Sequence, residues 1–565
     1  MRPQKSTESA LWIPGFCLWF LTLAVVVVIL ILVAIRFNQK PTCKLPPAAQ
    51  VVATAKLSSI SASGCVPVWQ VDVPKTILSG GKYCAQEPLT LTSPYDVMFS
   101  VFTTEAVTIN FGGNPVYTNG TQRVVFGSVP GGIVDITVLN TVATSFTRTT
   151  SYSGGFVQVA NGTVTLRNIK VNQFAGVAGI FGGSIDAANV EYRSFGPLVP
   201  TDDDSQANTA YVLFGDSKLR NVDVAIQGDN PLTFGAQGIY TSSNYWNRFA
   251  TYGFNHQWTN LNIEAQSGAW VLAARQLDLT NYDVNMNSDG GIGLLFGFSP
   301  RVTFASNGTI TRFNITMPSG AHGNEGILVF AANTLRLVNG QISGDASPAC
   351  HPPICPLLPA PVATGLLHIV PGRPAAGPPQ SERQLVELTN VKLLTNAGGA
   401  AALIHEPAAL LTGAPVNSMF DYRSGQIVSD GYGAYFESDT HDINIDADFS
   451  GGYYGIYAKN SVSDYEIQHC SFADECVGFH VGTGPLNVDF SFNRGRNVSI
   501  PTQYVGGPSG ITENDNRFIE TGGPCGTPPP PLLTYYNLIG GGSRRSDDVW
   551  ANNKVEAYQP QMGKH

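Results

Sequence analysis

Polar and apolar side chains alternate between positions 442 and 449, and the polar ones are of types that could do chemistry. They are Asp442, Asn444, Asp446 and Asp448. Side chains two positions apart on a β-strand lie about 7 Å apart on one face. Asp446 and Asp448 would then have roughly the separation of the acid and the base in an inverting glycoside hydrolase, about 6.5 to 9.5 Å. The same carboxylates would suit calcium, which prefers several oxygen ligands.

Tyrosines are dense on both sides of this acidic row. The apolar faces of sugar rings pack against tyrosine, and sugar hydroxyls hydrogen-bond with carboxylates and amides. We therefore predict a sugar-binding surface, with Asp446 and Asp448 as the candidates for catalysis. Its residues are Tyr435, Glu437, Asp442, Asn444, Asp446, Asp448, Tyr453 and Tyr454. The alternative is that the acidic row is the solvated outer face of a coil and that the tyrosines stack in the core.

Cysteines other than Cys17 number eight, and an even number suits disulfides in an oxidising compartment. A histidine lies between Cys350 and Cys355, but no second ligand pair with zinc spacing is nearby. We therefore expect a local disulfide there and no metal site. Cys470 and Cys476 are expected to form another disulfide at a coil edge. The connectivity of the others is open, because Cys43, Cys65 and Cys84 can pair locally or with Cys525.

Histidines are scattered along the chain, so no nucleophile–base pair can be argued from the sequence. Those in the later part are His405, His441, His469 and His480. We interpret them as structural. No cofactor is predicted apart from the calcium considered above.

The elements that would position these residues are short strands in a repeating pattern. A glycine precedes an apolar trio at Gly433, Gly455 and Gly478, with spacings of 22 and 23 residues. Repeats of this length with period-two alternation predict a β-solenoid, in which stacked coils bury a continuous core. Frequent glycine and asparagine argue against helical repeats.

An asparagine-containing strand followed by a glycine-led strand recurs between about 166 and 500. The segment 166–171 (Leu-Arg-Asn-Ile-Lys-Val) is echoed at 219–224 (Leu-Arg-Asn-Val-Asp-Val). This pattern resembles the right-handed parallel β-helix proteins of the pectin-lyase-like superfamily. The resemblance implies an all-β fold and either carbohydrate-active enzymes, tailspike-like adhesins or structural solenoids. By the same analogy the chain is a possible homotrimer.

Catalytic motifs of that superfamily are not reproduced here. The nearest match to the Gly-His-Gly motif of polygalacturonases is 321–323, where alanine replaces the first glycine, and the acidic run 202–204 falls in a loop. No set of calcium-binding aspartates with an arginine base, as in pectate lyases, is found. These departures from the motifs favour binding over catalysis of the kind seen in that superfamily. The sequence does not decide whether the chain is an enzyme. An enzyme would be a glycoside hydrolase or a polysaccharide lyase.

The segment 10–35 contains no charged residue, and its length is sufficient to span a bilayer. No cleavage-site pattern follows it, so we predict a retained signal anchor and a single-pass membrane protein. The flanking basic residues do not decide the orientation. The even cysteine count favours an extracellular or lumenal C-terminal part, or one on a virion envelope. Five glycosylation sequons are compatible with that placement: Asn119, Asn161, Asn307, Asn314 and Asn497.

Only 13% of the residues are charged and the net charge is −9, which excludes a nucleic-acid partner on electrostatic grounds. We divide the chain into a tail (1–9), an anchor (10–35), a stalk (36–85), a β cap (86–165), a parallel β-helix (166–522) with a proline-rich insertion (345–384), and a proline-rich C-terminal tail (523–565). The expected function is recognition of glycans or of a partner surface. The alternatives are a membrane-anchored polysaccharide hydrolase or lyase, and a structural surface or envelope protein without a ligand.

Overall fold

The structure is a computed structural model of the 565-residue chain, and it describes residues 64–529 with gaps. The gaps are 93–96, 119–122, 146–154, 160, 173–177, 195–208, 227–236, 242–252, 273, 298–305, 321–322, 331, 347–364, 372–382, 396–400, 406–416, 438–440, 460–462, 483–486, 506–509, 521 and 523–524. The predicted anchor, Cys350, Cys355, Asn119 and the segments 202–204 and 321–322 lie outside the described residues. Among the described residues, no helix has the length and apolar character needed to cross a membrane.

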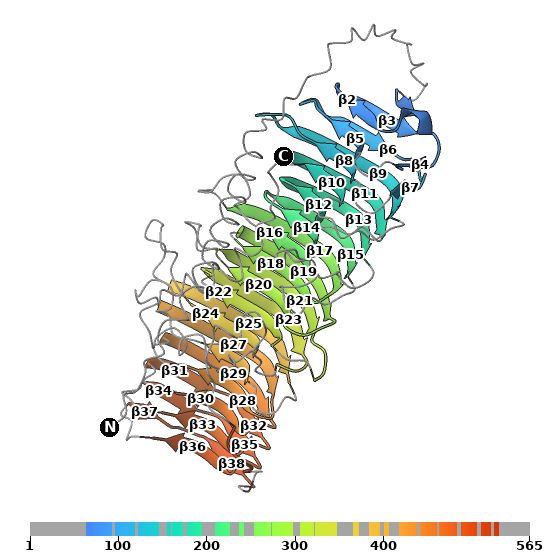
Figure 1. The fold of residues 1–565 in the computed structure, drawn as a ribbon. Coiled ribbons are helices and arrows are strands. Elements are labelled where there is room, and N and C mark those ends of the chain that lie inside the picture. The colour runs from blue at the N-terminus through green and yellow to red at the C-terminus, as the bar shows by residue number, and fades with distance from the viewer. Residues whose placement is uncertain are drawn as a thin grey trace, which may run out of the picture. The chain divides into compact units, whose positions relative to one another are not determined.

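The described chain is a stack of coils, and each coil contributes strands to two sheets (Figure 1). The strand pairings are parallel, for example β11 with β13 and β28 with β30. This confirms the prediction of an all-β solenoid. The only helical turn within the described ranges is the 3-10 turn η1 (Gln70–Asp72).

The first sheet, sheet A, has 22 strands within the described residues. They are β1 (Val66–Val68), β3 (Gly81–Ala85), β4 (Leu89–Thr90), β6 (Val107–Asn110), β7 (Val116–Thr118), β9 (Val134–Ser145), β11 (Gly162–Asn172), β13 (Ser184–Ser194), β15 (Ser217–Ile226), β17 (Phe254–Ala265), β19 (Ala274–Met286), β21 (Asn307–Thr316), β23 (Thr334–Ser343), β25 (Arg383–Leu394), β27 (Asn417–Val428), β29 (His441–Ser450), β31 (Ser463–Gln468), β32 (Ser471–Ala473), β34 (Val488–Ser491), β35 (Arg494–Arg496), β37 (Ile511–Thr512) and β38 (Arg517–Ile519).

The second sheet, sheet B, has 16 strands of three to six residues within the same ranges. They are β2 (Lys75–Ile77), β5 (Val97–Val101), β8 (Arg123–Gly127), β10 (Gly155–Val159), β12 (Ala178–Gly182), β14 (Thr209–Leu213), β16 (Gln237–Thr241), β18 (Ser267–Leu272), β20 (Ile292–Gly297), β22 (Glu325–Phe330), β24 (Gly365–Val370), β26 (Ala401–His405), β28 (Tyr432–Phe436), β30 (Tyr454–Ala458), β33 (Val477–Val481) and β36 (Ile500–Tyr504). Coils are therefore present from Val66 onward, inside the ranges that the sequence pattern assigned to a stalk and a cap.

Long strands of sheet A bend at one residue with left-handed backbone. In β11 this residue is Asn168, with φ 54°. Because of the bend, Arg167 and Asn168 both point outward while Leu166 and Ile169 are both buried. Asparagine tolerates this conformation better than most residues with a Cβ atom. The Leu-x-Asn-aliphatic motif seen in the sequence is thus a corner of the coil, and Arg312 and Ser424 take the place of asparagine at the corners of β21 and β27.

The central strands of sheet B, from β18 to β28, are buried on both faces. In β18, Ala269 and Val271 point into the core, while Trp270 between them faces away from it and is nonetheless 1% exposed. Leu295 and Leu328 occupy the equivalent position in later coils and are also buried. The sequences of parallel strands that are buried on both faces are continuous runs of apolar residues. This explains the apolar trios in the sequence, and it places the water-facing surface on sheet A.

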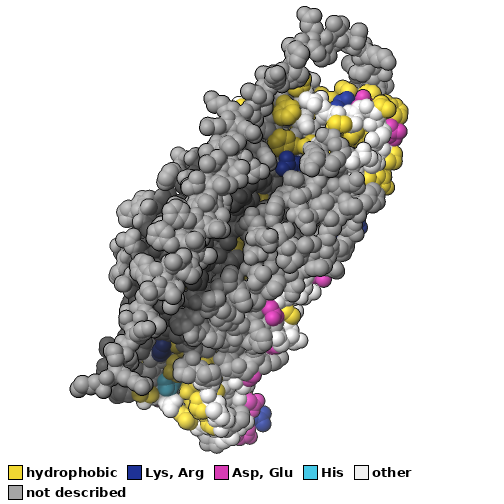
Figure 2. Space-filling view, in the orientation of Figure 1, with side chains coloured by type: hydrophobic (Ala, Val, Ile, Leu, Met, Phe, Trp, Pro, Cys, Tyr) yellow, Lys and Arg dark blue, Asp and Glu magenta, His cyan; other side chains and the backbone are white. Residues whose placement is uncertain are grey.

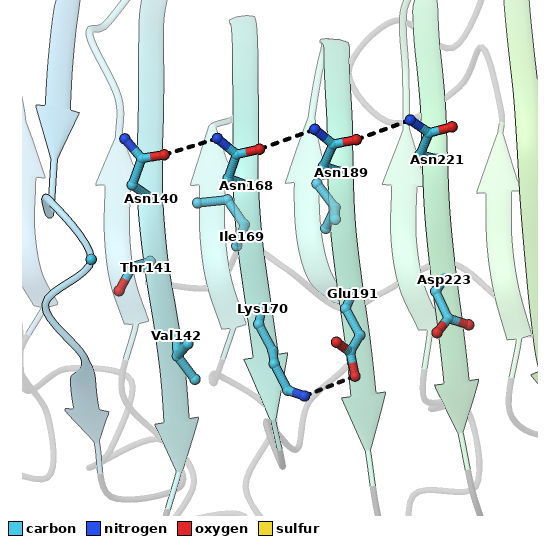
Figure 3. Close-up of a pocket in the computed structure, with 12 residues that line it drawn as sticks. Asn140, Thr141, Val142, Asn168, Ile169, Lys170, Asn189, Glu191, Asn221 and Asp223 are labelled. Carbon is cyan, nitrogen blue, oxygen red and sulfur yellow. Dashed lines mark hydrogen bonds and ion pairs between the residues drawn. The ribbon is translucent and has the colours of Figure 1, made fainter.

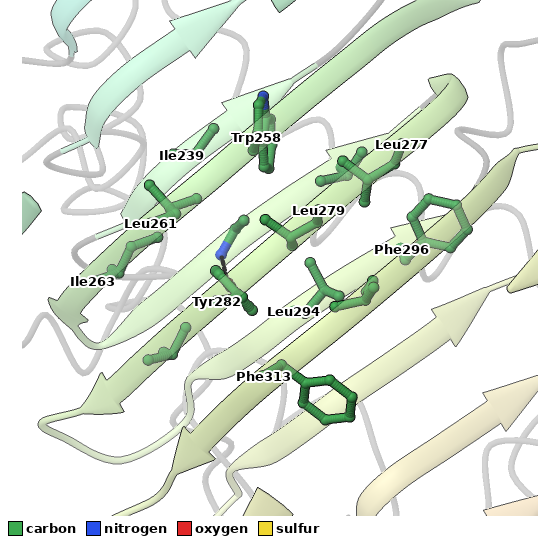
Figure 4. Close-up of a cluster of buried hydrophobic side chains, with 14 of the residues drawn as sticks. Ile239, Trp258, Leu261, Ile263, Leu277, Leu279, Tyr282, Leu294, Phe296 and Phe313 are labelled. Atoms are coloured by element: carbon green, nitrogen blue, oxygen red, sulfur yellow. Dashed lines mark hydrogen bonds between the residues drawn. The ribbon is translucent and has the colours of Figure 1, made fainter. Parts of the chain in front are cut away.

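The core consists of columns of like side chains. Leu279, Ile310 and Leu337 are in register on neighbouring strands and are almost fully buried. Figure 4 shows part of this core, in which Tyr282 also points inward. Its hydroxyl donates to the Gly293 carbonyl at 2.7 Å and accepts from the Ala269 amide at 3.0 Å. A polar group inside the core is satisfied by the backbone of the next coil.

Two disulfides occur among the described residues, Cys65–Cys84 and Cys476–Cys525. The predicted Cys470–Cys476 disulfide is wrong. The Cys470 thiol faces the core, where it is fully buried and donates to the Ile445 carbonyl at 3.3 Å. Burial raises the pKa of Cys470 to about 12. Cys476 lies instead at the corner before β33, where the chain returns after the last strand.

Glycine begins each apolar trio because the next coil leaves no space for a side chain. A Cβ at Gly433 would lie 2.4 Å from the Gly455 carbonyl oxygen, and one at Gly455 would lie 2.8 Å from that of Gly478. At Gly293 it would lie 2.5 Å from both the Gly326 carbonyl oxygen and the Ile315 side chain. The glycine column seen in the sequence is therefore a steric requirement of coil stacking.

Gly293→Ala is expected to destabilise the fold by about 1–3 kcal/mol, because the new methyl group must displace backbone of the adjacent coil. Gly522→Ala is the control, since nothing lies within 4 Å of a Cβ at that position. Urea unfolding of both variants measures the difference. Equal stability of the two variants would contradict the steric explanation.

Candidate functional site

The predicted acidic row lies on one outward face, as expected. In β29 the four polar side chains alternate with buried Ile443 and Ile445, and Asp446 and Asp448 are exposed. The left-handed residue of this strand is Asp442, near its start, with φ 55°. No corner residue stands between Asp446 and Ala447, where β27 has Ser424, so the alternation from Ile443 onward is uninterrupted. On the preceding strand Arg423 is in register with Asp446 and pairs with Asp421 at 2.5 Å. The row is an open, water-facing part of sheet A.

The predicted aromatic residues lie elsewhere. Tyr435 belongs to β28 and Tyr454 to β30, both in sheet B, while Glu437 and Tyr453 flank these strands. Their separation from the acidic row follows from the coil, because consecutive strands β28 and β29 enter different sheets. The predicted composite surface is therefore two separate surfaces, and the structure does not bring its aromatic and acidic halves together.

The aromatic residues form a cluster outside the main core, which we call the tyrosine platform and define as Tyr432, Tyr435, Tyr454 and Tyr457. Tyr432 stacks on Tyr454 with ring centroids 5.4 Å apart, and Tyr435 stacks on Tyr457 at the same distance. His480 extends the second stack, 4.4 Å from Tyr457. Tyr432 and Tyr435 are buried, whereas Tyr454 and Tyr457 are half-buried. The platform therefore keeps part of its ring surface accessible.

A buried carboxylate borders the platform. Glu437 is 1% exposed and accepts hydrogen bonds from the Lys459 ammonium at 2.6 Å and from the Tyr435 hydroxyl at 3.0 Å. Burial, and then the charge of Glu437, raise the pKa of Tyr435. The Tyr435 hydroxyl therefore stays protonated and acts as a donor.

A second site, which the sequence did not reveal, is a groove along the corners of sheet A. Its volume is about 550 Å³, and it is lined by the corner asparagines together with neighbouring residues of β9, β11, β13 and β15, some outward and some buried (Figure 3). Its lining residues are Gly113, Asn140, Thr141, Val142, Asn168, Ile169, Lys170, Asn189, Val190, Glu191, Asn221 and Asp223. We call it the ladder groove. The recurring asparagine was visible in the sequence, but its outward direction was not.

Corner asparagines form a hydrogen-bonded ladder. Asn168 donates to Asn140 at 2.9 Å, Asn189 to Asn168 at 3.0 Å, and Asn221 to Asn189 at 2.9 Å. The ladder begins at Asn110 and continues through Asn260 and Asn281. A side-chain amide has two N–H donors and a carbonyl oxygen with two lone pairs. Each inner member uses one donor and one lone pair within the ladder, so one of each is left for another partner.

Ion pairs run beside the asparagine ladder, along one edge of the groove (Figure 3). Glu191 accepts from Lys170 at 2.9 Å and also pairs with Arg193, which reaches Asp223 at 3.1 Å. Burial by itself would raise the pKa of Glu191, but the hydrogen bonds from Arg193 and Lys170 lower it below its usual value. Charges of both signs are thus paired along the edge.

A serine–histidine pair is also present, inside the core. Ser217 Oγ lies 2.8 Å from His256 Nδ1 and accepts a hydrogen bond from Trp258 Nε1. Burial lowers the pKa of His256 to about 3, so the imidazole is neutral. Ser217 and His256 are 2% and 1% exposed, so no substrate can reach this pair. The pair satisfies His256 Nδ1 and Trp258 Nε1 inside the core, whereas His256 Nε2 has no hydrogen-bond partner among the described residues.

The predicted structural histidines are placed in different environments. His405 is buried, with Nε2 2.9 Å from Ser418 Oγ, while His469 is exposed and stacks on Phe492. Within the described part of the chain, no three His, Cys, Asp or Glu side chains are grouped so as to hold a metal ion.

Sequon asparagines within the described ranges already donate hydrogen bonds from their side-chain amides. Asn161 donates to the Gly132 carbonyl, Asn314 to Asp283 and Asn497 to Asp474. Asn307 donates to the Arg275 carbonyl at 3.3 Å. A glycan attached at any of these nitrogens would use one of its two hydrogens.

Comparison with known proteins gives no relatives. No protein-family model matches the chain, and neither the curated proteins nor the solved structures yield a significant match. The functional argument therefore rests on the residues of this chain.

Asn189→Ala and Asn189→Gly both remove two ladder hydrogen bonds, but only alanine places a Cβ in the left-handed conformation, where φ is 56°. We expect the alanine variant to be less stable than the glycine variant by about 1 kcal/mol. Urea unfolding of the two variants measures this difference. A more stable alanine variant would show that backbone strain does not select asparagine here.

A second expectation concerns Glu475, which is buried in the core and has its pKa raised well above the usual value, first by burial and then by Asp474. The unfolded chain loses this proton above about pH 4.3 while the folded chain keeps it, so stability falls as pH rises. Glu475→Gln should therefore increase the free energy of unfolding at pH 7 and leave it nearly unchanged at pH 4. Exposed Glu466→Gln is the control. Parallel pH profiles of wild type and Glu475→Gln would refute a protonated Glu475.

Proposed function

We propose that the solenoid binds an extended glycan in the ladder groove. The observation that carries this proposal is the row of ladder asparagines along an open groove of ligand size, in which each inner asparagine has one donor and one acceptor that the ladder does not use. Sugar hydroxyls both donate and accept hydrogen bonds, so each matches such an amide. No catalytic step is part of the proposal.

The spacing of the ladder supports a polymer as the ligand. Neighbouring parallel strands lie about 4.8 Å apart, so an amide is presented at that interval along the groove. This interval is close to the length of one pyranose ring. A chain of sugars that runs along the solenoid axis would therefore meet the same pair of polar groups at each unit, which suits a repetitive surface.

Charges at the groove favour a neutral or weakly charged glycan. Lys170, Arg193 and Arg167 are engaged by Glu191, Asp223 and Asp186. These pairs largely cancel one another at short range, so the groove has no single-sign field that would attract a polyanion. Hydroxyl recognition would then dominate the affinity.

The proposed setting is the outer surface of a membrane. The uncharged segment 10–35 supports an anchor, and the disulfides Cys65–Cys84 and Cys476–Cys525 support an oxidising compartment. Left-handed asparagine corners and parallel coils support placement of the fold among the right-handed, pectin-lyase-like β-helices.

The proposal is tested by blocking the groove. Val142 lines the groove, is 38% exposed and is not part of the hydrophobic core. Val142→Trp should therefore fill the groove without unfolding the chain. On a glycan array with the full chain in detergent, we expect wild type to bind a defined glycan saturably and the variant to bind it at least about tenfold more weakly, a loss of about 1.4 kcal/mol.

Two controls locate the site. Lys392→Trp adds the same side chain in the same outward column of sheet A, far along the stack from the groove. Asp446→Ala/Asp448→Ala removes the exposed carboxylates of β29. Both should bind the glycan as wild type does. Loss of binding in the aspartate variant would move the site to the acidic row, and no binding by the folded wild type would leave a structural surface protein as the better explanation.

A further inference from the structure

The chain returns to the tyrosine platform after its last strand. Cys525 is bonded to Cys476, which immediately precedes β33, the sheet B neighbour of β30. Four residues further on, the carbonyl oxygen of Pro529 lies 3.5 Å from the hydroxyl of Tyr432, at the outer limit of a hydrogen bond. Pro529 is half-buried, whereas Gly526, Thr527 and Pro528 are exposed. The contact therefore places Pro529 itself against the platform.

The chemistry of the two partners is complementary. A proline-rich segment prefers the extended polyproline II conformation, in which the backbone makes no internal hydrogen bonds. Its carbonyl groups then need external donors, and prolines offer flat apolar faces. The platform supplies tyrosine hydroxyls and stacked rings that are half-buried at Tyr454 and Tyr457. Recognition of polyproline II segments by aromatic grooves uses these two kinds of contact.

We propose that the tyrosine platform is a binding surface for polyproline II segments, and that its resident occupant is the chain's own Pro528–Pro529, which follows a bend at Thr527. The Cys476–Cys525 disulfide holds this segment beside the platform. A tether of a few residues gives an effective concentration in the millimolar range, so even a weak contact is populated. A proline-rich segment of another protein would have to displace the resident one. This inference is independent of the glycan proposal, because platform and ladder groove lie on different sheets.

The first test compares the full chain with a Pro528→Gly/Pro529→Gly variant, in which the segment loses its conformational preference but keeps its disulfide. Nitration of tyrosines by tetranitromethane is followed residue by residue by mass spectrometry. We expect nitration of Tyr432 and Tyr454 to become several-fold faster in the variant. Tyr117, in β7 of sheet A, is the internal reference and should not change. Pro115→Gly is the control for loss of a proline elsewhere.

The second test adds a synthetic peptide with the sequence of residues 526–531 and measures its binding by fluorescence anisotropy. The Pro528→Gly/Pro529→Gly variant should bind the peptide, and wild type should not, because its platform is occupied. Tyr432→Phe in the variant background should weaken binding while leaving the fold intact, since only the hydroxyl is removed. Unchanged nitration together with absence of peptide binding overturns the proposal, as does equal peptide binding by wild type and variant.

Discussion

The whole structure depends on the close approach of one coil to the next. Parallel strands lie about 4.8 Å apart, so each residue meets the equivalent residue of its neighbours. Where the backbone itself forms the contact, only glycine fits, as at Gly293 and Gly433. At the corner of a coil, asparagine adopts the left-handed backbone conformation, and its side-chain amide forms a hydrogen bond with the corner asparagine of the next coil. The sequence pattern follows from this one distance.

The two sheets respond differently to the same stacking. Sheet A keeps one face in water, and side chains there can be polar, paired and available to a ligand, as at Lys170 and Glu191. The central strands of sheet B, from β18 to β28, are buried on both faces, and residues such as Trp270 are buried although they point away from the core. Any site that recognises a solvated polymer is therefore expected on sheet A, where the ladder groove lies.

The C-terminal coils depart from this regularity. The continuous asparagine ladder ends at Asn281, because Arg312 occupies the corner of β21. Near the C-terminal end, the outer face of sheet B presents the tyrosine platform. The disulfide to Cys525 holds the returning chain at this end. A repetitive surface along the stack and an aromatic surface near its end are thus separate features, because each arises where a different kind of side chain occupies equivalent positions in successive coils.

The sequence alone determined the class of fold, since strand alternation, the glycine column and the recurring asparagine are local properties that every coil repeats. It also placed Asp446 and Asp448 correctly on an outward face. Tertiary structure decided what depends on distances between residues far apart in the chain. It separated Tyr435 from the acidic row by assigning β28 and β29 to different sheets, and it paired Cys476 with Cys525 because Cys470 faces the core. It also aligned asparagines 21 to 32 positions apart into one groove, which only the stacking register can do.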